Sequence, residues 1–178
     1  MTTPSRSNNP PVELRIDAAT ERDIPLILHF IKQLAEYERL SHEVVATEDG
    51  LRETLFGDFP AAEVVIARAA SDQGAGPMEP IGFALYFTTY STFLGRPGIY
   101  LEDLFVSPAW RGHGVGRALL THLAKLAVER RCGRLEWAVL DWNEPAIGLY
   151  NRLGARPMDE WTVYRVTGDA LTNLVGES

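Results

Sequence analysis

Residues 109 to 120, AWRGHGVGRALL, place three glycines at alternate positions between two arginines, just before an apolar stretch with helical spacing. Glycines let a ligand approach the main chain, and the free amides and dipole at the start of a helix attract anions. Arg111 and Arg117 can neutralise charge at the rim of such a site. The pattern indicates a phosphate-binding turn, although a plain turn with glycines at positive φ would use the same residues.

The spacing excludes the two common nucleotide motifs. A dinucleotide fingerprint that starts at Gly112 needs a glycine where Arg117 stands, and the G-K-[ST] of a P-loop is absent. What remains is R-G-x-G-x-G followed by a helix.

Two adjacent acids, Glu102 and Asp103, lie just upstream in a segment typical of a strand. Simple alternation divides this strand into one face with Tyr100, Glu102, Leu104 and Val106 and another with Leu101, Asp103 and Phe105. Alternation therefore predicts different tasks for the two acids, whereas a bulge would let Asp103 line the same pocket as Glu102. Solvated or ion-paired surface positions would also suit both carboxylates.

Strand and helix patterns alternate along the chain, which indicates an α/β or α+β layer structure. Strands are expected at residues 12–18, 63–70, 81–90, 99–106, 134–140 and 161–166. Helices are expected at about 20–38, 47–56, 116–130 and 144–153, with Thr20, Thr47 and Asn143 as N-caps. Residues 71–80, rich in Gly and Pro, indicate a flexible hairpin loop.

The length of 178 residues and the hydrophobic content of 46% fit one domain, here residues 12–178, after a polar, disordered arm at 1–11. The single cysteine, Cys132, cannot pair within the chain, and we expect a cytoplasmic protein. The net charge of -7 disfavours nucleic acid and mildly favours cationic small molecules. We expect no signal peptide, no membrane span and, because the four histidines lack metal-ligand spacing, no metal.

The glycine stretch resembles the acetyl-CoA signature [RQ]-x-x-G-x-[GA] of the GNAT N-acetyltransferase superfamily, which Arg111, Gly114 and Gly116 match. The segments YLEDLFVSPAWRGHGVG, VLDWNEPAIGLYNRLGA and LAEYERLSHEV together resemble the diamine and thialysine acetyltransferase branch, in the same order over about residues 12–170. The resemblance implies a mixed, strongly curved central sheet flanked by helices, acetyl-CoA as cosubstrate and a homodimer.

The resemblance also implies roles for individual residues. It assigns the amine substrate to Tyr37, Glu38 and Glu102, with Glu102 removing the proton directly or through water, and a bulge would add Asp103 to these residues. It assigns acetyl-CoA to Leu104, Phe105 and Val106, to Arg111, Gly112, His113, Gly114, Val115, Gly116 and Arg117, and to Asn143 and Tyr150. Tyr150 would protonate the departing thiolate, although a helical tyrosine is often simply part of a core.

The segment YSTFLGR departs from the polyamine enzymes of this branch, which have an acid and a tryptophan where Ser91 and Phe93 stand. We therefore expect acetylation of a small primary amine, thialysine-like, lysine-like or a diamine, by direct attack in a ternary complex. Two alternatives remain open: acetylation of a protein or peptide amine at the same donor site, and a non-catalytic acetyl-CoA sensor.

Overall fold

The computed structural model describes residues 13–70 and 77–176. Their contacts divide into two compact units, one up to Ala138 and one from Val139 on, and each is described by itself. The expected N-terminal arm at 1–11 and most of the hairpin loop at 71–80 lie outside the described residues. The single domain stays a prediction.

The first unit is a five-stranded sheet in sequence order, β1 to β5. The strands are β1 (Leu14–Ala18), β2 (Glu63–Ala69), β3 (Glu79–Ser91), β4 (Arg96–Val106) and β5 (Leu135–Trp137). The first four pair antiparallel, whereas β5 runs parallel to β4. The mixed α/β sheet that the resemblance implied is therefore confirmed.

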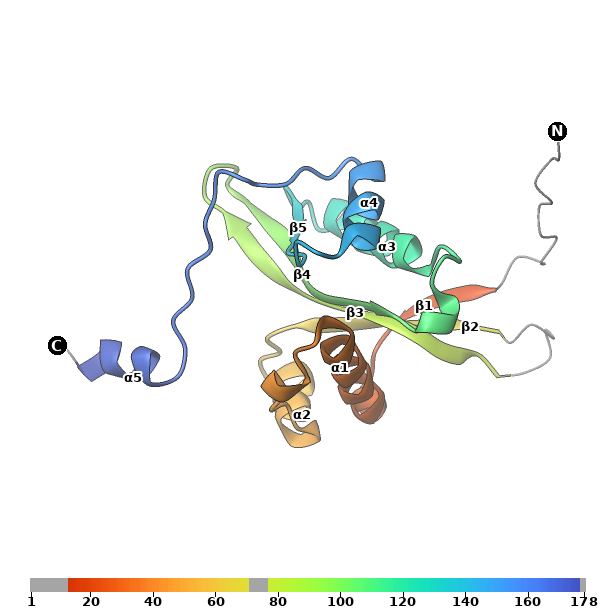
Figure 1. The fold of residues 1–178 in the computed structure, drawn as a ribbon, viewed down its shortest axis with the longest axis horizontal. Helices are drawn as coiled ribbons and strands as arrows, with labels where there is room; N and C mark the ends of the chain where they lie inside the picture. Colours follow the sequence, from red (N-terminus) through yellow and green to blue (C-terminus); the bar gives the residue numbers. More distant parts are fainter. Residues whose placement is uncertain (1–12, 71–76, 177–178) are drawn as a thin grey trace. The chain divides into compact units, whose positions relative to one another are not determined.

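Helices cover both faces of this sheet (Figure 1). On one face lie α1 (Ile24–Glu38) and α2 (Glu48–Phe56), and on the other lies α3 (Val115–Glu129). Short 3-10 turns at Glu21–Asp23, Ser41–Glu43 and Pro108–Trp110 connect the elements. No helix within the described ranges is both long and apolar enough to cross a bilayer.

A buried aromatic cluster fixes α1 on the sheet. The Phe30 ring of α1 stacks on Phe83 of β3 at 5.5 Å between centroids and meets Phe105 of β4 at 5.7 Å. All three side chains are at most 3% exposed, and burial of each large apolar side chain contributes roughly 1.5–3 kcal/mol. On the opposite face α3 buries the apolar stripe that its spacing predicted, including Leu119 and Leu123.

The expected caps are largely in place. Thr47 Oγ1 accepts the Gly50 amide at 3.1 Å and begins α2 where the sequence indicated. Thr20 instead begins the 3-10 turn Glu21–Asp23, where its own amide donates to Asp23 Oδ2 at 2.8 Å, and α1 starts only at Ile24.

The second unit contains α4 (Glu144–Arg152) and α5 (Asp169–Gly176). The strand expected at residues 161–166 is wrong, because those residues belong to no strand and the described part of this unit offers no other strand to pair with. Helix α5 was not anticipated. The fifth strand is also shorter than the expected 134–140, since its ladder with β4 has only three pairs and ends at Leu101.

Candidate active site

A β-bulge in β4 arranges the two adjacent acids. Leu85 of β3 lies opposite Asp103, while the next residue, Tyr86, lies opposite Leu101, so Glu102 is an extra residue without a partner in β3. Directly opposed residues of an antiparallel pair share a face, and neighbours along a strand do not. Asp103 therefore lies on the opposite face from Leu101, and the alternation that placed both on one face is wrong.

After the bulge, Asp103 and Phe105 lie on the face that α1 covers. Phe105 lies opposite Phe83, and both belong to the cluster around Phe30 of α1. The bulge thus brings Asp103 to the side of the sheet where Glu38 ends α1.

Three carboxylates interact at this place. Burial raises the pKa of Asp103 to about 6, and the negative charges of Glu102 and Glu38 add to the effect. Burial also raises the pKa of Glu38 above its ordinary value. Because none of these three acids has a salt bridge among the described residues, the cluster favours a cationic ligand.

Arg111 connects this cluster to the glycine turn. Its guanidinium carbon lies 4.3 Å from the centre of the Tyr37 ring and 5.8 Å from that of Phe105. Its Nε donates to the backbone carbonyl of Val106 at 3.1 Å. Residues Tyr37 and Glu38 at the end of α1 are thereby held beside the start of the turn.

The glycine turn has the backbone that its sequence requires. Gly112 and Gly114 have φ values of 81° and 83°, in the left-handed region that glycine adopts without strain. A Cβ at either position would meet nothing within 4 Å, so the space beside the main chain is open. His113 lies in the same turn, with Nδ1 3.0 Å from the Arg111 carbonyl oxygen.

The first turn of α3 follows directly. Gly114 is the N-cap, no side chain caps the helix, and the first turn has no acidic residue. The amides of Val115, Gly116 and Arg117 therefore give this end of the helix a positive partial charge, which suits a phosphate.

The end of β4 offers a second set of main-chain groups. Leu104, Phe105 and Val106 pair with β3 on one side, and β5 does not extend beyond Leu101 on the other. Within the sheet as described, this edge of β4 has no strand partner, so its peptide groups can bind a ligand as a strand would.

Asn143 and Tyr150 lie on α4 in the second unit. Asn143 Oδ1 accepts the Ala146 amide at 3.4 Å, and Pro145 occupies the first turn, as the sequence predicted. Tyr150 is half-buried in the last turn of the helix. The structure brings together Tyr37, Glu38, Asp103 and Arg111 in the first unit, whereas the donor-site roles of Asn143 and Tyr150 stay predictions.

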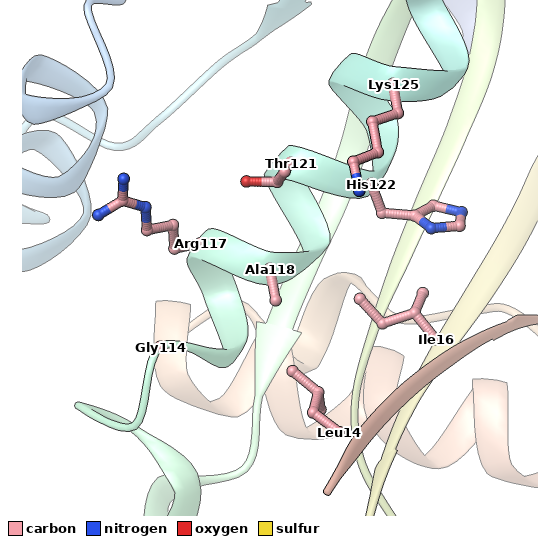
Figure 2. Close-up of a pocket in the computed structure, with 8 residues that line it drawn as sticks. All are labelled: Leu14, Ile16, Gly114, Arg117, Ala118, Thr121, His122 and Lys125. Atoms are coloured by element: carbon pink, nitrogen blue, oxygen red, sulfur yellow. The ribbon is translucent and has the colours of Figure 1, made fainter. Parts of the chain in front are cut away.

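A pocket that sequence reasoning missed lies between β1 and α3, with a volume of about 480 Å³. Leu14 and Ile16 face it from the strand, and Ala118, His122 and Lys125 line it from the helix (Figure 2). Arg117 points away from the two strand residues. Gly114 and Arg117 of the glycine stretch also line this pocket, whereas no sequence pattern indicated the wall that β1 forms. Across the part of the chain that is described, no three His, Cys, Asp or Glu residues gather to hold a metal.

Comparison with known proteins identifies the family. Residues 31–155 match the acetyltransferase (GNAT) family. The chain is 41% identical over 167 residues to a thialysine N-epsilon-acetyltransferase of Bos taurus, covering 91% of this chain and 97% of the relative. The chain belongs to the GNAT acetyltransferase family. As a member of this family, the protein is an N-acetyltransferase.

Two further proteins are similar to this chain. An L-ornithine N5-acetyltransferase of Arabidopsis thaliana is 37% identical over 195 residues, covering 88% of this chain and 86% of the relative. An integron cassette protein from the mobile metagenome of V. cholerae shares the fold with a TM-score of 0.73 at 27% identity, covering 93% of this chain and 98% of the other. The resemblance found from the motifs is confirmed at the level of family and fold.

Proposed function

We propose that this protein transfers the acetyl group of acetyl-CoA to a primary amine of a small thialysine-like, lysine-like or diamine substrate, by direct attack in a ternary complex. The observation that carries the proposal is the carboxylate cluster of Glu38, Glu102 and Asp103, held beside a glycine turn suited to phosphate. The similarity to enzymes named for thialysine and ornithine supports this choice of amine.

The carboxylate cluster would bind and deprotonate the amine. An alkyl ammonium has a pKa of about 10.4, so reaching the neutral nucleophile at pH 7 costs about 4.6 kcal/mol. Glu38 and Asp103 would hold the cation, which relieves their mutual repulsion. Glu102 would then accept the proton, directly or through a water molecule.

The glycine turn and the end of β4 fit acetyl-CoA. The open space beside Gly112 and Gly114 and the uncapped start of α3 suit a diphosphate, with Arg117 at the rim. Main-chain groups of Leu104, Phe105 and Val106 would hold the pantetheine arm and polarise the carbonyl. Acetyl-CoA supplies the activated thioester.

Two residues of α4 would complete the donor site. Asn143 would hold the pantetheine arm, and the Tyr150 hydroxyl would give its proton to the departing sulfur. Positioned proton donors of this kind contribute roughly two to four orders of magnitude in rate.

The substrate preference follows from the hairpin between β3 and β4. Ser91 is only 6% exposed, and its Oγ accepts the Leu94 amide at 3.3 Å, so it stabilises the turn. Phe93 is 93% exposed at the tip. Neither residue supplies a negative charge for the distal ammonium of a polyamine, and polyamines are therefore the poorer substrates in this proposal.

A homodimer and a cytoplasmic location also belong to the proposal. Large apolar side chains of the second unit, among them Val163 at 87% exposed and Tyr164 at 91%, are of the kind that a second copy would cover. The single cysteine is consistent with a reducing compartment. Light scattering after size-exclusion chromatography tests the dimer, and a mass of 19.8 kDa would exclude it.

The experiment that tests the activity is thiol release from acetyl-CoA with thialysine, lysine, ornithine and spermidine. We expect thialysine, lysine or ornithine to have the highest kcat/KM. We also expect Glu102→Gln to lower kcat/KM about a hundredfold. Glu129→Gln, on the exposed side of α3, is the matched control. Spermidine leading by more than about tenfold overturns the ranking, and a faster reaction with a peptide lysine favours the protein acceptor. Tight acetyl-CoA binding without thiol release favours the sensor.

A further inference from the structure

Among the described residues, Arg111 is held by other groups of the chain, whereas Arg117 is not. The Arg111 guanidinium lies over the Tyr37 ring at 4.3 Å, and its Nε is already used by the carbonyl of Val106 at 3.1 Å. Arg117, the other arginine of the motif, has no such ring or carbonyl contact among the interactions of the described residues. The two arginines that frame the glycine turn are thus in different environments.

The contacts of Arg111 reach both the proposed donor site and the proposed acceptor site. Val106 ends β4 and is followed by the short 3-10 turn that leads into the glycine turn, whereas Tyr37 precedes Glu38 at the end of α1. That end of α1 is tightly closed: Arg39 has a left-handed φ of 63°, and the Leu40 amide donates to the Ala35 carbonyl at 2.7 Å. Arg111 contacts this helix end through the Tyr37 ring and can thereby align it with Asp103.

We propose that Arg111 is a positioning residue for the amine acceptor: by stacking on Tyr37 while anchored to Val106, it fixes the end of α1 so that Glu38 faces Asp103. This inference rests on the proposed function and deepens it. A planar guanidinium is required, because it can donate from Nε in its plane while its face covers a ring, which a lysine ammonium cannot do.

The deciding experiment separates this role from phosphate binding by changing the donor. Amine KM is measured for wild type, Arg111→Gln and Arg111→Lys, with acetyl-CoA and with S-acetyl-pantetheine, which lacks the nucleotide and its diphosphate. We expect both variants to raise the amine KM about three- to tenfold with either donor, while kcat changes less. If the effect disappears with S-acetyl-pantetheine, Arg111 acts only on the diphosphate and the proposal is wrong.

The Tyr37 ring provides a second arm. In a Tyr37→Phe background, which keeps the ring, Arg111→Gln should raise the amine KM by the same factor as in wild type. In a Tyr37→Leu background the factor should fall to about one, because the two residues act as a unit. An unchanged factor in the Leu background overturns the proposal. Lys125→Gln, an exposed charge change on α3, is the control for loss of one cation.

A readout independent of turnover distinguishes failure of this inference from failure of the proposed function. Amide hydrogen exchange of residues 35–40 should be about three- to tenfold faster in Arg111→Gln than in wild type, with exchange in α2 unchanged. Equal exchange at the end of α1 refutes the positioning role whether or not any amine is acetylated. If wild type releases no thiol but exchange in Arg111→Gln is still faster, only the proposed function is refuted and the positioning role stands.

Discussion

Replacing Asp103 with asparagine should stabilise the fold near neutral pH. Burial, with Glu102 and Glu38 adding to it, raises the pKa of Asp103 from 3.8 to about 6. One pKa unit corresponds to about 1.36 kcal/mol, so the ionised carboxylate costs at most about 3 kcal/mol of folding free energy. Because the side chain is partly exposed and solvent screens its neighbours, we expect Asp103→Asn to gain about 1–2 kcal/mol at pH 7.5.

The pH dependence of this gain has a defined sign. The folded-state pKa of Asp103 is raised, so the folded protein binds more protons than the unfolded chain between pH 3.8 and about 6. Wild-type stability is therefore lost as pH rises through this window, and the loss is complete above it. The advantage of Asp103→Asn should be small at pH 4.5 and reach its plateau by pH 7.

Urea unfolding of wild type and Asp103→Asn at several values between pH 4.5 and 7.5 measures the difference directly. Asp58→Asn, in an exposed loop, is the matched control and should show no comparable pH-dependent gain. Two outcomes would refute the reasoning about burial and repulsion. In one, the variant is less stable than wild type at pH 7.5; in the other, its free energy of unfolding differs from that of wild type by the same amount at pH 4.5 and at pH 7.5.

The same substitution should impair the reaction. Removal of one carboxylate weakens the cation site, and we expect kcat/KM for the amine to fall about tenfold or more. In wild type, kcat/KM should rise with pH through an apparent pKa near the value of about 6 for Asp103. A stabilised variant with full activity would exclude Asp103 from the acceptor site.

Further predictions concern the turn, the donor site and the sheet. Gly114→Ala, at a φ of 83°, should cost about 1–2 kcal/mol and weaken acetyl-CoA binding by calorimetry, whereas Gly95→Ala, at a φ of 59° in the β3–β4 hairpin, should cost stability alone. Tyr150→Phe should lower kcat at least tenfold and leave acetyl-CoA affinity within about twofold; intact turnover would make Tyr150 structural. Glu63→Gln should cost about 1 kcal/mol in thermal unfolding, because Arg130, which lowers the pKa of Glu63, pairs with it through two contacts of 2.5 and 2.6 Å. The stability that this ion pair contributes is present above pH 4.5 and is lost as pH falls below that value. Equal melting temperatures of wild type and Glu63→Gln at pH 7 would contradict the prediction.

Local signals in the sequence predicted helices α1 to α4 and the glycine turn well. Thr47 as a cap, the apolar stripe around Leu119 and Leu123, and glycine at 112 and 114 each follow from residues within a few positions of one another. These features depend on short-range sterics and hydrogen bonds, which a single segment contains in full.

Features that depend on a partner segment could not be predicted in this way. The bulge at Glu102 arises from the register between β3 and β4, and a strand's own alternation does not report it. The contact between Tyr37 and Arg111 joins residues far apart in sequence, with no local pattern to mark it. Residues 161–166 have strand propensity but need a neighbouring strand, so their pattern alone misled the prediction.

The extra residue in β4 shifts by one position the alternation of side chains between the two faces of the sheet. Upstream of Glu102, odd-numbered positions such as Leu101 share a face with Tyr86; downstream, odd-numbered positions such as Asp103 and Phe105 share the face of Leu85. An alignment that places a gap within this strand would assign the positions beyond the gap to the wrong face of the sheet, the face of α3 instead of that of α1 or the reverse. A mutant library of this protein should therefore assign positions of β4 to the two faces of the sheet separately before and after Glu102.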